Sequence, residues 1–158
     1  MPAMERRLST GVPGLDKMVG GGLFEGSANL VAGAPGTGKT TLGLHFLAAG
    51  VAAGERGLLV TFEYLPQQIY RDALRRGWDL ESWERKGLVR VVCTTPDVLL
   101  AESSKGHIFL DDLLAEVGAK RLVIDSMTHF EFLPREPMAL RSDLSGLMNH
   151  LRLLDVTT

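Results

Sequence analysis

Residues 33–40 read Gly33-Ala34-Pro35-Gly36-Thr37-Gly38-Lys39-Thr40 and set the framework of the whole chain. They fit the pattern G-x-x-x-x-G-K-[S/T], the Walker A phosphate-binding loop. Glycines permit a tight turn and let the backbone approach a phosphate without an intervening side chain. Consecutive N–H groups then surround the anion at the positive end of the following helix. The stretch therefore predicts a nucleotide-phosphate site.

Two side chains of this loop have predicted roles of their own. Lys39 can reach the β- and γ-phosphates as a point charge, and the Thr40 hydroxyl can ligate Mg²⁺. A glycine-rich turn with no ligand is the alternative, but an apolar run at 29–32 precedes the loop and a helical pattern follows it, which is the context of a phosphate site. The residues predicted to contact the cofactor are Ala34, Pro35, Gly36, Thr37, Gly38, Lys39, Thr40 and Thr41.

Composition places the chain among globular proteins. Its 158 residues suffice for one domain, and 45% of them are hydrophobic and 23% charged. The net charge of -2 gives no electrostatic support for strong nucleic-acid binding, although a local basic loop remains an alternative. No apolar stretch approaches the roughly 20 residues that a membrane helix needs. We therefore expect no membrane partner.

A cytoplasmic location is expected from the N-terminus and the cysteine content. Residues 1–10 are polar and lack the apolar segment of a signal peptide. Cys93 is the one cysteine of the sequence, so the chain has no internal disulfide, which fits a reducing compartment. Because Cys93 ends an apolar run, we expect a buried thiol.

Short apolar strands alternate with helical patterns along the rest of the chain. This alternation predicts an α/β fold with a mainly parallel sheet and helices on both faces. Leucines at 140, 144, 147, 151 and 154 predict an amphipathic helix that packs on the core, in preference to a coiled coil. The predicted strands are 27–32, 58–62, 88–92 and 121–125, and the predicted helices are 14–19, 39–49, 66–77, 108–117 and 140–154.

The two ends of the chain carry separate expectations. Residues 155–158 resemble the start of a fifth strand, so we expect a single partial domain over 1–158 whose last strands are missing or whose sheet edge is covered by something else. Residues 1–26 are punctuated by glycines and form a lead-in segment. This segment is either a flexible entry to the first strand or a lid or seat beside the nucleotide.

Two carboxylates follow predicted strands and complete the predicted site. Asp125 ends the strand 121–125, the position of a Walker B carboxylate that faces Mg²⁺. Glu63 follows the strand 58–62, where a carboxylate can polarise the water that attacks the γ-phosphate. A solvated loop acid is the alternative for Glu63.

These blocks carry a resemblance to a known family. The lead-in looks like the entry segment of the RecA/RadA superfamily, and the segments after it are most similar to the KaiC-like ATPases. The resemblance covers nearly the whole chain and implies a RecA-like P-loop core that binds ATP with Mg²⁺. The blocks concerned are 9–18, 20–22, 57–63, 66–69, 77–80 and 124–128.

The resemblance also assigns roles and partners. It implies that Glu63 is the first of two adjacent glutamates, the one that activates water, whereas the second position is Tyr64 here. Lys39, Asp125 and Glu63 are thus the predicted catalytic residues, and Thr40 and Asp125 the predicted metal residues. The family further implies a homo-oligomer, a ring such as a hexamer or a filament, with ATP at the subunit interfaces. Its Lys/Arg residues that reach a neighbour's γ-phosphate have no counterpart that can be assigned here.

Three functions follow from this reading. The first is an ATPase that hydrolyses ATP to ADP and phosphate in order to drive assembly or signalling. The second is a nucleotide-dependent interaction module with little hydrolysis. The third is a recombinase-related DNA-binding ATPase, which the acidic balance and the residues Glu131 and Glu136 around Arg135 disfavour.

Overall fold

The computed structural model describes residues 6–101 and 109–158, and the first residue of the helix predicted at 108–117 lies outside them. The elements, in chain order, are β1 (Arg7–Leu8), α1 (Pro13–Met18), β2 (Leu23–Phe24), α2 (Lys39–Ala52), β3 (Arg56–Thr61), α3 (Pro66–Leu74), α4 (Leu80–Arg85), β4 (Val89–Cys93), α5 (Pro96–Ala101), α6 (Phe109–Val117), β5 (Ala119–Asp125), η2 (Met127–Phe132) and α7 (Pro137–Leu153).

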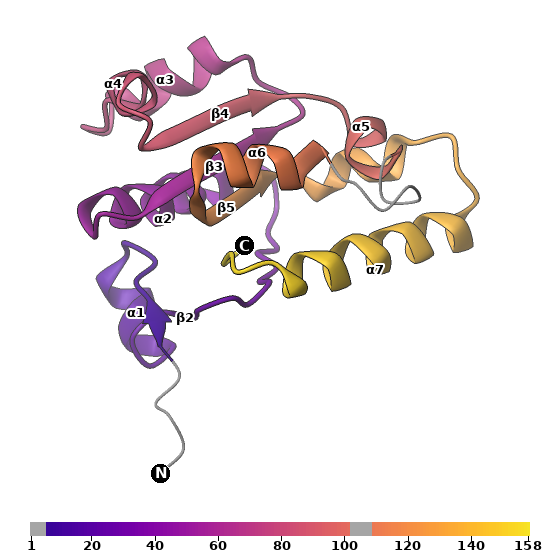
Figure 1. Cartoon of the computed structure of the whole chain (residues 1–158), viewed down its shortest axis with the longest axis horizontal. Coiled ribbons are helices and arrows are strands. Elements are labelled where there is room, and N and C mark those ends of the chain that lie inside the picture. The colour runs from indigo at the N-terminus through magenta and orange to yellow at the C-terminus, as the bar shows by residue number, and fades with distance from the viewer. Residues whose placement is uncertain (1–5, 102–108) are drawn as a thin grey trace.

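A parallel sheet in the order β4-β3-β5 forms the centre of the molecule (Figure 1). In its register Thr61 lies opposite both Cys93 and Asp125. The carboxyl ends of the three strands therefore meet at one edge. Ligands of open α/β sheets bind at such an edge.

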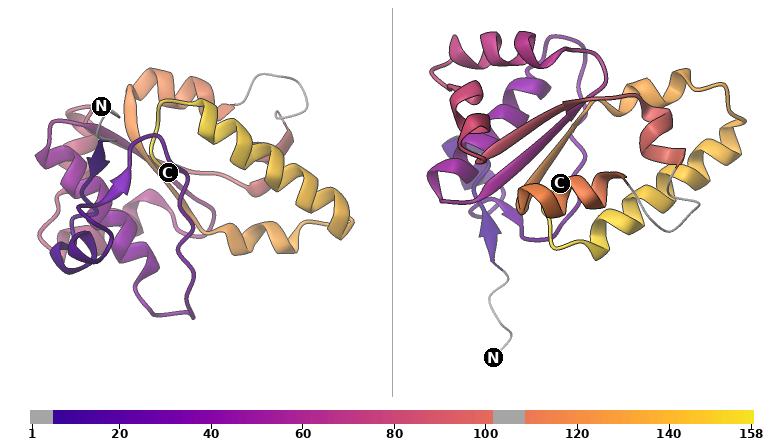
Figure 2. Two further views of the ribbon diagram at one scale, coloured as in Figure 1. Left: turned by 90° about the horizontal axis from the view of Figure 1, so that it is seen from below. Right: turned by 45° about the horizontal axis from the view of Figure 1, so that its top comes forward.

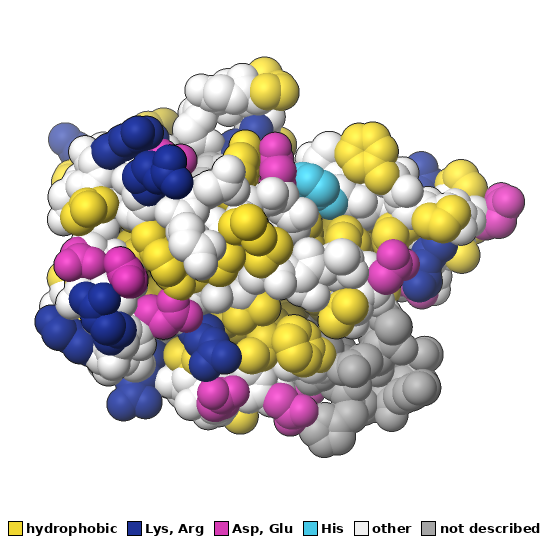
Figure 3. All heavy atoms as spheres, turned by 90° about the horizontal axis from the view of Figure 1, so that it is seen from above, with side chains coloured by type: hydrophobic (Ala, Val, Ile, Leu, Met, Phe, Trp, Pro, Cys, Tyr) yellow, Lys and Arg dark blue, Asp and Glu magenta, His cyan; other side chains and the backbone are white. Residues whose placement is uncertain are grey.

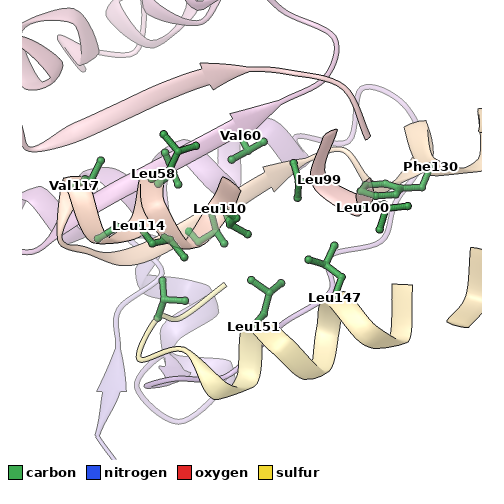
Figure 4. Close-up of a cluster of buried hydrophobic side chains, with 14 residues drawn as sticks. Leu58, Val60, Leu99, Leu100, Leu110, Leu114, Val117, Phe130, Leu147 and Leu151 are labelled. Atoms are coloured by element: carbon green, nitrogen blue, oxygen red, sulfur yellow. The ribbon is translucent and has the colours of Figure 1, made fainter. Parts of the chain in front are cut away.

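Helices cover both faces of this sheet, as the alternation of strands and helices predicts. Successive side chains of β3 point to opposite faces, so that Leu59 joins one core and Leu58 and Val60 join the other. The first core contains buried side chains of α2, α3, α4 and β4. The second contains those of α5, α6 and α7, including Leu147 and Leu151 of the predicted leucine helix (Figure 4). The α/β prediction is confirmed.

The strand predicted at 27–32 is wrong over most of its length. Asn29 donates its N–H to Thr158 O over 2.8 Å, and Ser27 O accepts from Thr158 N over 2.9 Å. Thr157 in turn pairs with Arg121 of β5, so residues 157–158 lie between β5 and residues 27–29. These residues form the start of the fifth strand that was expected. Leu30 and Val31 lie beyond this ladder in the described structure and are 82% and 50% exposed. An apolar run becomes a strand only where a neighbour supplies hydrogen bonds.

The helix predictions are confirmed for the long, periodic segments and incomplete elsewhere. Prolines begin α3, α5 and α7, where a missing N–H costs nothing. The separate helix α4 was not predicted; Asp79 caps it by accepting a 2.9 Å hydrogen bond from Ser82 N. The prediction of a buried Cys93 is also wrong. Cys93 is exposed because it is the last residue of an edge strand.

The lead-in segment packs beside the C-terminal half of α2, away from the phosphate loop. β1 and β2 pair antiparallel, with α1 between them in the chain. A Cβ at Gly11 would lie 2.4 Å from His45 O and 3.3 Å from Ala49, six and ten residues beyond the start of α2. In both views of Figure 2 the lead-in lies at one side and α7 runs from the far side of the molecule toward the centre. The lid interpretation is therefore wrong, because the segment braces the fold at the opposite end of α2.

One buried arginine connects this segment to the core. Arg121 of β5 is 2% exposed, and its Nε lies 2.7 Å from Glu55 Oε2. Its Nη1 donates to Ser9 O over 2.6 Å and to Phe46 O over 2.8 Å. A buried charge is tolerated only when it is paired and its remaining protons are bonded. The ion pair and these two hydrogen bonds join the lead-in, α2, the turn before β3, and β5.

We predict that Arg121→Met lowers the free energy of unfolding by about 3–5 kcal/mol, because it leaves buried acceptors unpaired. Arg90→Met is the matched control, since Arg90 pairs with Glu116 in an exposed contact and should cost less than about 1 kcal/mol. Urea unfolding of both variants measures the difference. Equal losses would contradict a structural role for the buried pair.

Candidate functional site

The phosphate loop turns into α2 through glycines in left-handed conformation. Gly36 and Gly38 have φ angles of 79° and 92°, which other residues rarely adopt. Gly38 is the N-cap residue of α2. A side chain at Gly33 would meet Thr37 Oγ1 at 2.6 Å, so that position requires glycine for a steric reason. The predicted glycines are thus explained by the loop's geometry.

The start of α2 presents a row of N–H donors. The first hydrogen bond of the helix runs from Leu42 N to Gly38 O over 2.8 Å. The N–H groups of Lys39, Thr40 and Thr41 lie before it and have no partner within the helix. The first turn of α2 contains no acidic residue, so its positive end is not neutralised locally. An anion of matching shape can bind there.

Lys39 adds a full positive charge beneath the loop. Its Nζ donates to Gly33 O over 2.7 Å and to Ala34 O over 2.9 Å. An ammonium group has three protons, so these two bonds leave one for a phosphate oxygen. Thr37 also holds the loop, because its hydroxyl donates to Ala34 O over 2.8 Å.

Asp125 reaches the loop from the end of β5. Thr40 Oγ1 donates to Asp125 Oδ2 over 2.7 Å, which joins residues 85 positions apart in the sequence. The Asp125 backbone is fixed independently, since its carbonyl accepts from Phe62 N over 3.1 Å. The peptide bond between Asp125 and Ser126 is cis. The structure thus brings together Lys39, Thr40 and Asp125.

The oxygens of Thr40 and Asp125 suit a magnesium ion. Mg²⁺ prefers hard oxygen ligands and usually takes only one or two from the protein, the others coming from water and substrate phosphates. Within residues 6–101 and 109–158 there is no cluster of three or more His, Cys, Asp or Glu that could hold a metal alone. The donor set fits an ion held jointly with a phosphate.

Glu63 lies at the same edge of the sheet, two residues after β3 ends. The backbone N of Glu63 lies 3.4 Å from Thr61 Oγ1. Thr61 is opposite Asp125 in the sheet register. The Glu63 side chain is exposed. The neighbouring Glu63 carboxylate raises the pKa of the Tyr64 phenol above its usual value. Sequence reasoning placed Glu63 correctly at this edge.

A pocket opens beside the start of α2, toward α3. Sequence reasoning did not predict this pocket, although Asp72 and Arg76 are four residues apart and thus share one side of α3 and its C-terminal turn. Arg76 is held there by a 2.8 Å hydrogen bond to Asp72 O. The pocket is lined by Thr40, Thr41, Leu44, Tyr64, Ile69, Asp72 and Arg76.

The helices and the surface of the described residues bear on membrane spanning and on the exposure of apolar side chains. In the described parts of the chain no helix has the length and apolarity to cross a membrane. On the face drawn in Figure 3, apolar side chains lie in several places between charged ones. Phe132, Met138 and Leu153 are among the apolar residues with more than three quarters of their surface exposed, at 78%, 77% and 84%.

Comparison with known proteins gives a family match over nearly the whole chain. Residues 8–158 match the family model described as the KaiC ATPase. The circadian clock oscillator protein KaiC of Picosynechococcus sp. is 40% identical over 123 residues, which are 77% of this chain and 23% of that protein. A UPF0273 protein of Pyrococcus horikoshii is 33% identical over 138 residues, covering 79% of this chain and 56% of the relative. One of Methanopyrus kandleri is 36% identical over 135 residues, with shares of 77% and 54%. The chain spans about a quarter of the clock protein and just over half of the UPF0273 proteins.

The close approach of α2 to β5 generates a test of the site. A Cβ at Gly43 would lie 2.8 Å from Val123 Cγ1, a stiff branched side chain. We predict that Gly43→Ala pushes α2 away from β5, costs about 1–3 kcal/mol in urea unfolding, and weakens MgADP binding because Thr40 moves from Asp125. Gly146→Ala in α7 is the control: a Cβ there meets nothing within 4 Å and should stabilise by about 0.5–1 kcal/mol. Similar effects of the two substitutions would refute the packing argument.

Proposed function

The chain belongs to the KaiC family of ATPases, since the family model covers residues 8–158, and from this premise we propose that it binds ATP with Mg²⁺ and hydrolyses it to ADP and phosphate. The observation that carries the proposal is the 2.7 Å hydrogen bond from Thr40 to Asp125 at the end of the Lys39 loop. This contact puts one hydroxyl and one carboxylate together beside a row of N–H donors. Such a combination suits a nucleotide phosphate with its magnesium ion.

Each residue of the site has a role in this proposal. The N–H groups of residues 36–41 bind the phosphates, and Lys39 neutralises charge on the β- and γ-oxygens. Thr40 and Asp125 hold Mg²⁺, which when bound neutralises the charge that develops between these phosphates. The pocket beside Thr41 leaves room for the remainder of the nucleotide.

Glu63 acts as the general base. Its carboxylate accepts a proton from water as the water oxygen forms a bond to the γ-phosphorus. The bond between that phosphorus and the bridging oxygen breaks, and ADP leaves with the electron pair. Glu63 is exposed, so in this proposal bound nucleotide or a neighbouring subunit shields it from bulk water.

A homo-oligomer in a ring or filament and a cytoplasmic location complete the proposal. Phe132, which ends the helix η2 that follows β5, is exposed, as is Met138 at the start of α7, and a second copy of the chain would cover them in such an assembly. The name of the Picosynechococcus relative refers to a circadian clock. We propose for this chain only the coarser role of driving assembly or signalling.

The exposure of Glu63 also favours a second candidate, a nucleotide-dependent interaction module with little hydrolysis. The recombinase-related alternative has less support. Arg135, in the segment where a DNA-contacting loop would lie, forms an ion pair with Asp143 and has Glu136 beside it. A salt-dependent shift of DNA mobility would revive that alternative.

We predict that Glu63→Gln lowers kcat for phosphate release by about 10²–10⁴-fold, because it removes the proton acceptor, while ATP affinity changes little. Lys39→Ala should instead abolish binding. Glu81→Gln is the matched control, since Glu81 is an exposed glutamate on α4 that pairs with Arg85 and should leave both values unchanged. Phosphate release and calorimetric ATP titration measure the two properties.

Unchanged turnover in Glu63→Gln would sink the assignment of the base. Tight ATP binding without phosphate release by the unmodified protein would select the interaction module instead. Binding that survives Lys39→Ala would contradict the placement of the phosphates.

A further inference from the structure

His150 of α7 and Asp111 of α6 form a polar contact that the proposed hydrolysis does not use. His150 Nε2 lies 2.7 Å from Asp111 Oδ1, and the contact joins residues 39 positions apart in the sequence. Each side chain is 27% exposed, so water reaches the pair only in part. The pair is therefore placed to influence how firmly α7 is held on α6.

The pair lies beside the apolar contact that α7 makes with the second core. Leu147 and Leu151, on either side of His150 in the sequence, are 0% and 1% exposed. They point from α7 toward the side of the core where Leu110 and Leu114 of α6 lie (Figure 4). The first three residues of α7 are exposed instead. The C-terminal half of α7, which carries the pair, is therefore the half that holds this helix in place.

The chain that follows α7 supports the segment that enters the phosphate loop. Within five residues of the end of α7 it reaches Thr157 and Thr158. The N–H of Gly26 donates to Thr157 Oγ1 over 2.8 Å, and the N–H of Asn29 donates to Thr158 O over 2.8 Å. Loosening of the C-terminal half of α7 would therefore also loosen the base of the phosphate loop.

The positions of the two residues on their helices favour the charged form of the pair. His150 lies in the last turn of α7, whose negative end favours a cation. Asp111 lies in the first turn of α6, whose positive end favours an anion. Histidine is the side chain that changes charge between pH 5 and 8. A protonated imidazole donates a stronger, charge-assisted hydrogen bond to a carboxylate than a neutral one does.

The other charged groups on the helices around the pair keep their charge over this range of pH. Helix α5 packs against both α6 and α7. The other charged side chains that the structure describes on these three helices are Asp97 on α5, Asp112 and Glu116 on α6, and Arg141, Asp143 and Arg152 on α7. Carboxylates and guanidinium groups do not ordinarily change charge between pH 5.5 and 8. On these helices, a change of α7 over that range therefore originates at His150.

We propose that the pair of His150 and Asp111 is a pH-sensitive latch on α7. Protonation of His150 fastens the C-terminal half of α7 to α6. Loss of the proton, as the pH rises through the titration of His150, loosens α7 together with Thr157 and Thr158. This inference goes beyond the proposed function and does not depend on it, because it concerns the packing of a helix and not the bound nucleotide.

The test is amide hydrogen exchange, corrected for the intrinsic exchange rate at each pH, which measures the opening of α7. Protection of the amides of Leu147, Leu151 and Asn29 should be roughly 3- to 10-fold higher at pH 5.5 than at pH 8, the factor of a partly shielded ion pair at two helix ends. Asp111→Asn should lower the protection at pH 5.5 and remove this difference, because it leaves no charge for the imidazolium to pair with.

Asp143→Asn is the matched control. Asp143 of α7 pairs with Arg135, and their side chains are 30% and 33% exposed, close to those of the latch. Arginine stays charged at both pH values, so this substitution should leave the pH difference intact. Equal protection of the unmodified protein at the two pH values would overturn the inference. A pH difference that survives in Asp111→Asn would overturn it as well.

A spectroscopic readout keeps the contact testable if α7 exchanges too fast to measure. The chain has four histidines, so His150→Gln removes one of four ring signals and thereby assigns it. In Asp111→Asn the His150 signal should shift. The signal of His129, whose Nδ1 lies 3.2 Å from Ser126 Oγ, should not move. An unmoved His150 signal would show that its ring has no bond to Asp111 and would overturn the latch.

Discussion

The packing of α2 against β5 is the contact on which both the fold and the site depend. Two glycines allow this packing. A Cβ at Gly43 would lie less than 3 Å from the side chain of Val123, and a Cβ at Gly50 would lie less than 3 Å from that of Arg121. At one end of the interface, Arg121 joins the lead-in and the turn before β3 to the core. At the other end, Thr40 meets Asp125. A helix set further out would break that hydrogen bond and separate the two halves of the phosphate site.

The proposed site has a part that binds the phosphates and a part that reacts, and the surrounding structure holds the first more firmly than the second. The binding part, formed by the loop and Asp125, rests on elements that are packed and hydrogen-bonded on several sides. In the proposed function the reacting part is the exposed Glu63, whose backbone N lies 3.4 Å from the hydroxyl oxygen of Thr61. On the proposed function, binding of nucleotide therefore needs little rearrangement, whereas turnover depends on what covers one exposed carboxylate. This difference explains how one site could serve an ATPase or a nucleotide-dependent interaction module.

Sequence reasoning succeeded where a local pattern alone determines the structure. The phosphate loop has fixed glycine spacing, and strands such as β3 and β5 are short apolar runs that end in polar residues. It failed where the outcome depends on distant neighbours. Residues 30–32 read as a strand but have no neighbouring strand in the described structure, and Cys93 is exposed because β4 lies at an edge.

The most direct test of the account is an amide NMR titration of the chain with MgADP. The account predicts saturable shifts that are largest for the N–H groups of Gly36, Gly38, Lys39, Thr40 and Thr41, which would donate to the phosphates. Amides of α7, which packs on the opposite core, should stay in place. Shifts that fail to saturate, or that centre on α7 and leave residues 36–41 unchanged, would contradict the central claim that the nucleotide's phosphates bind at the start of α2.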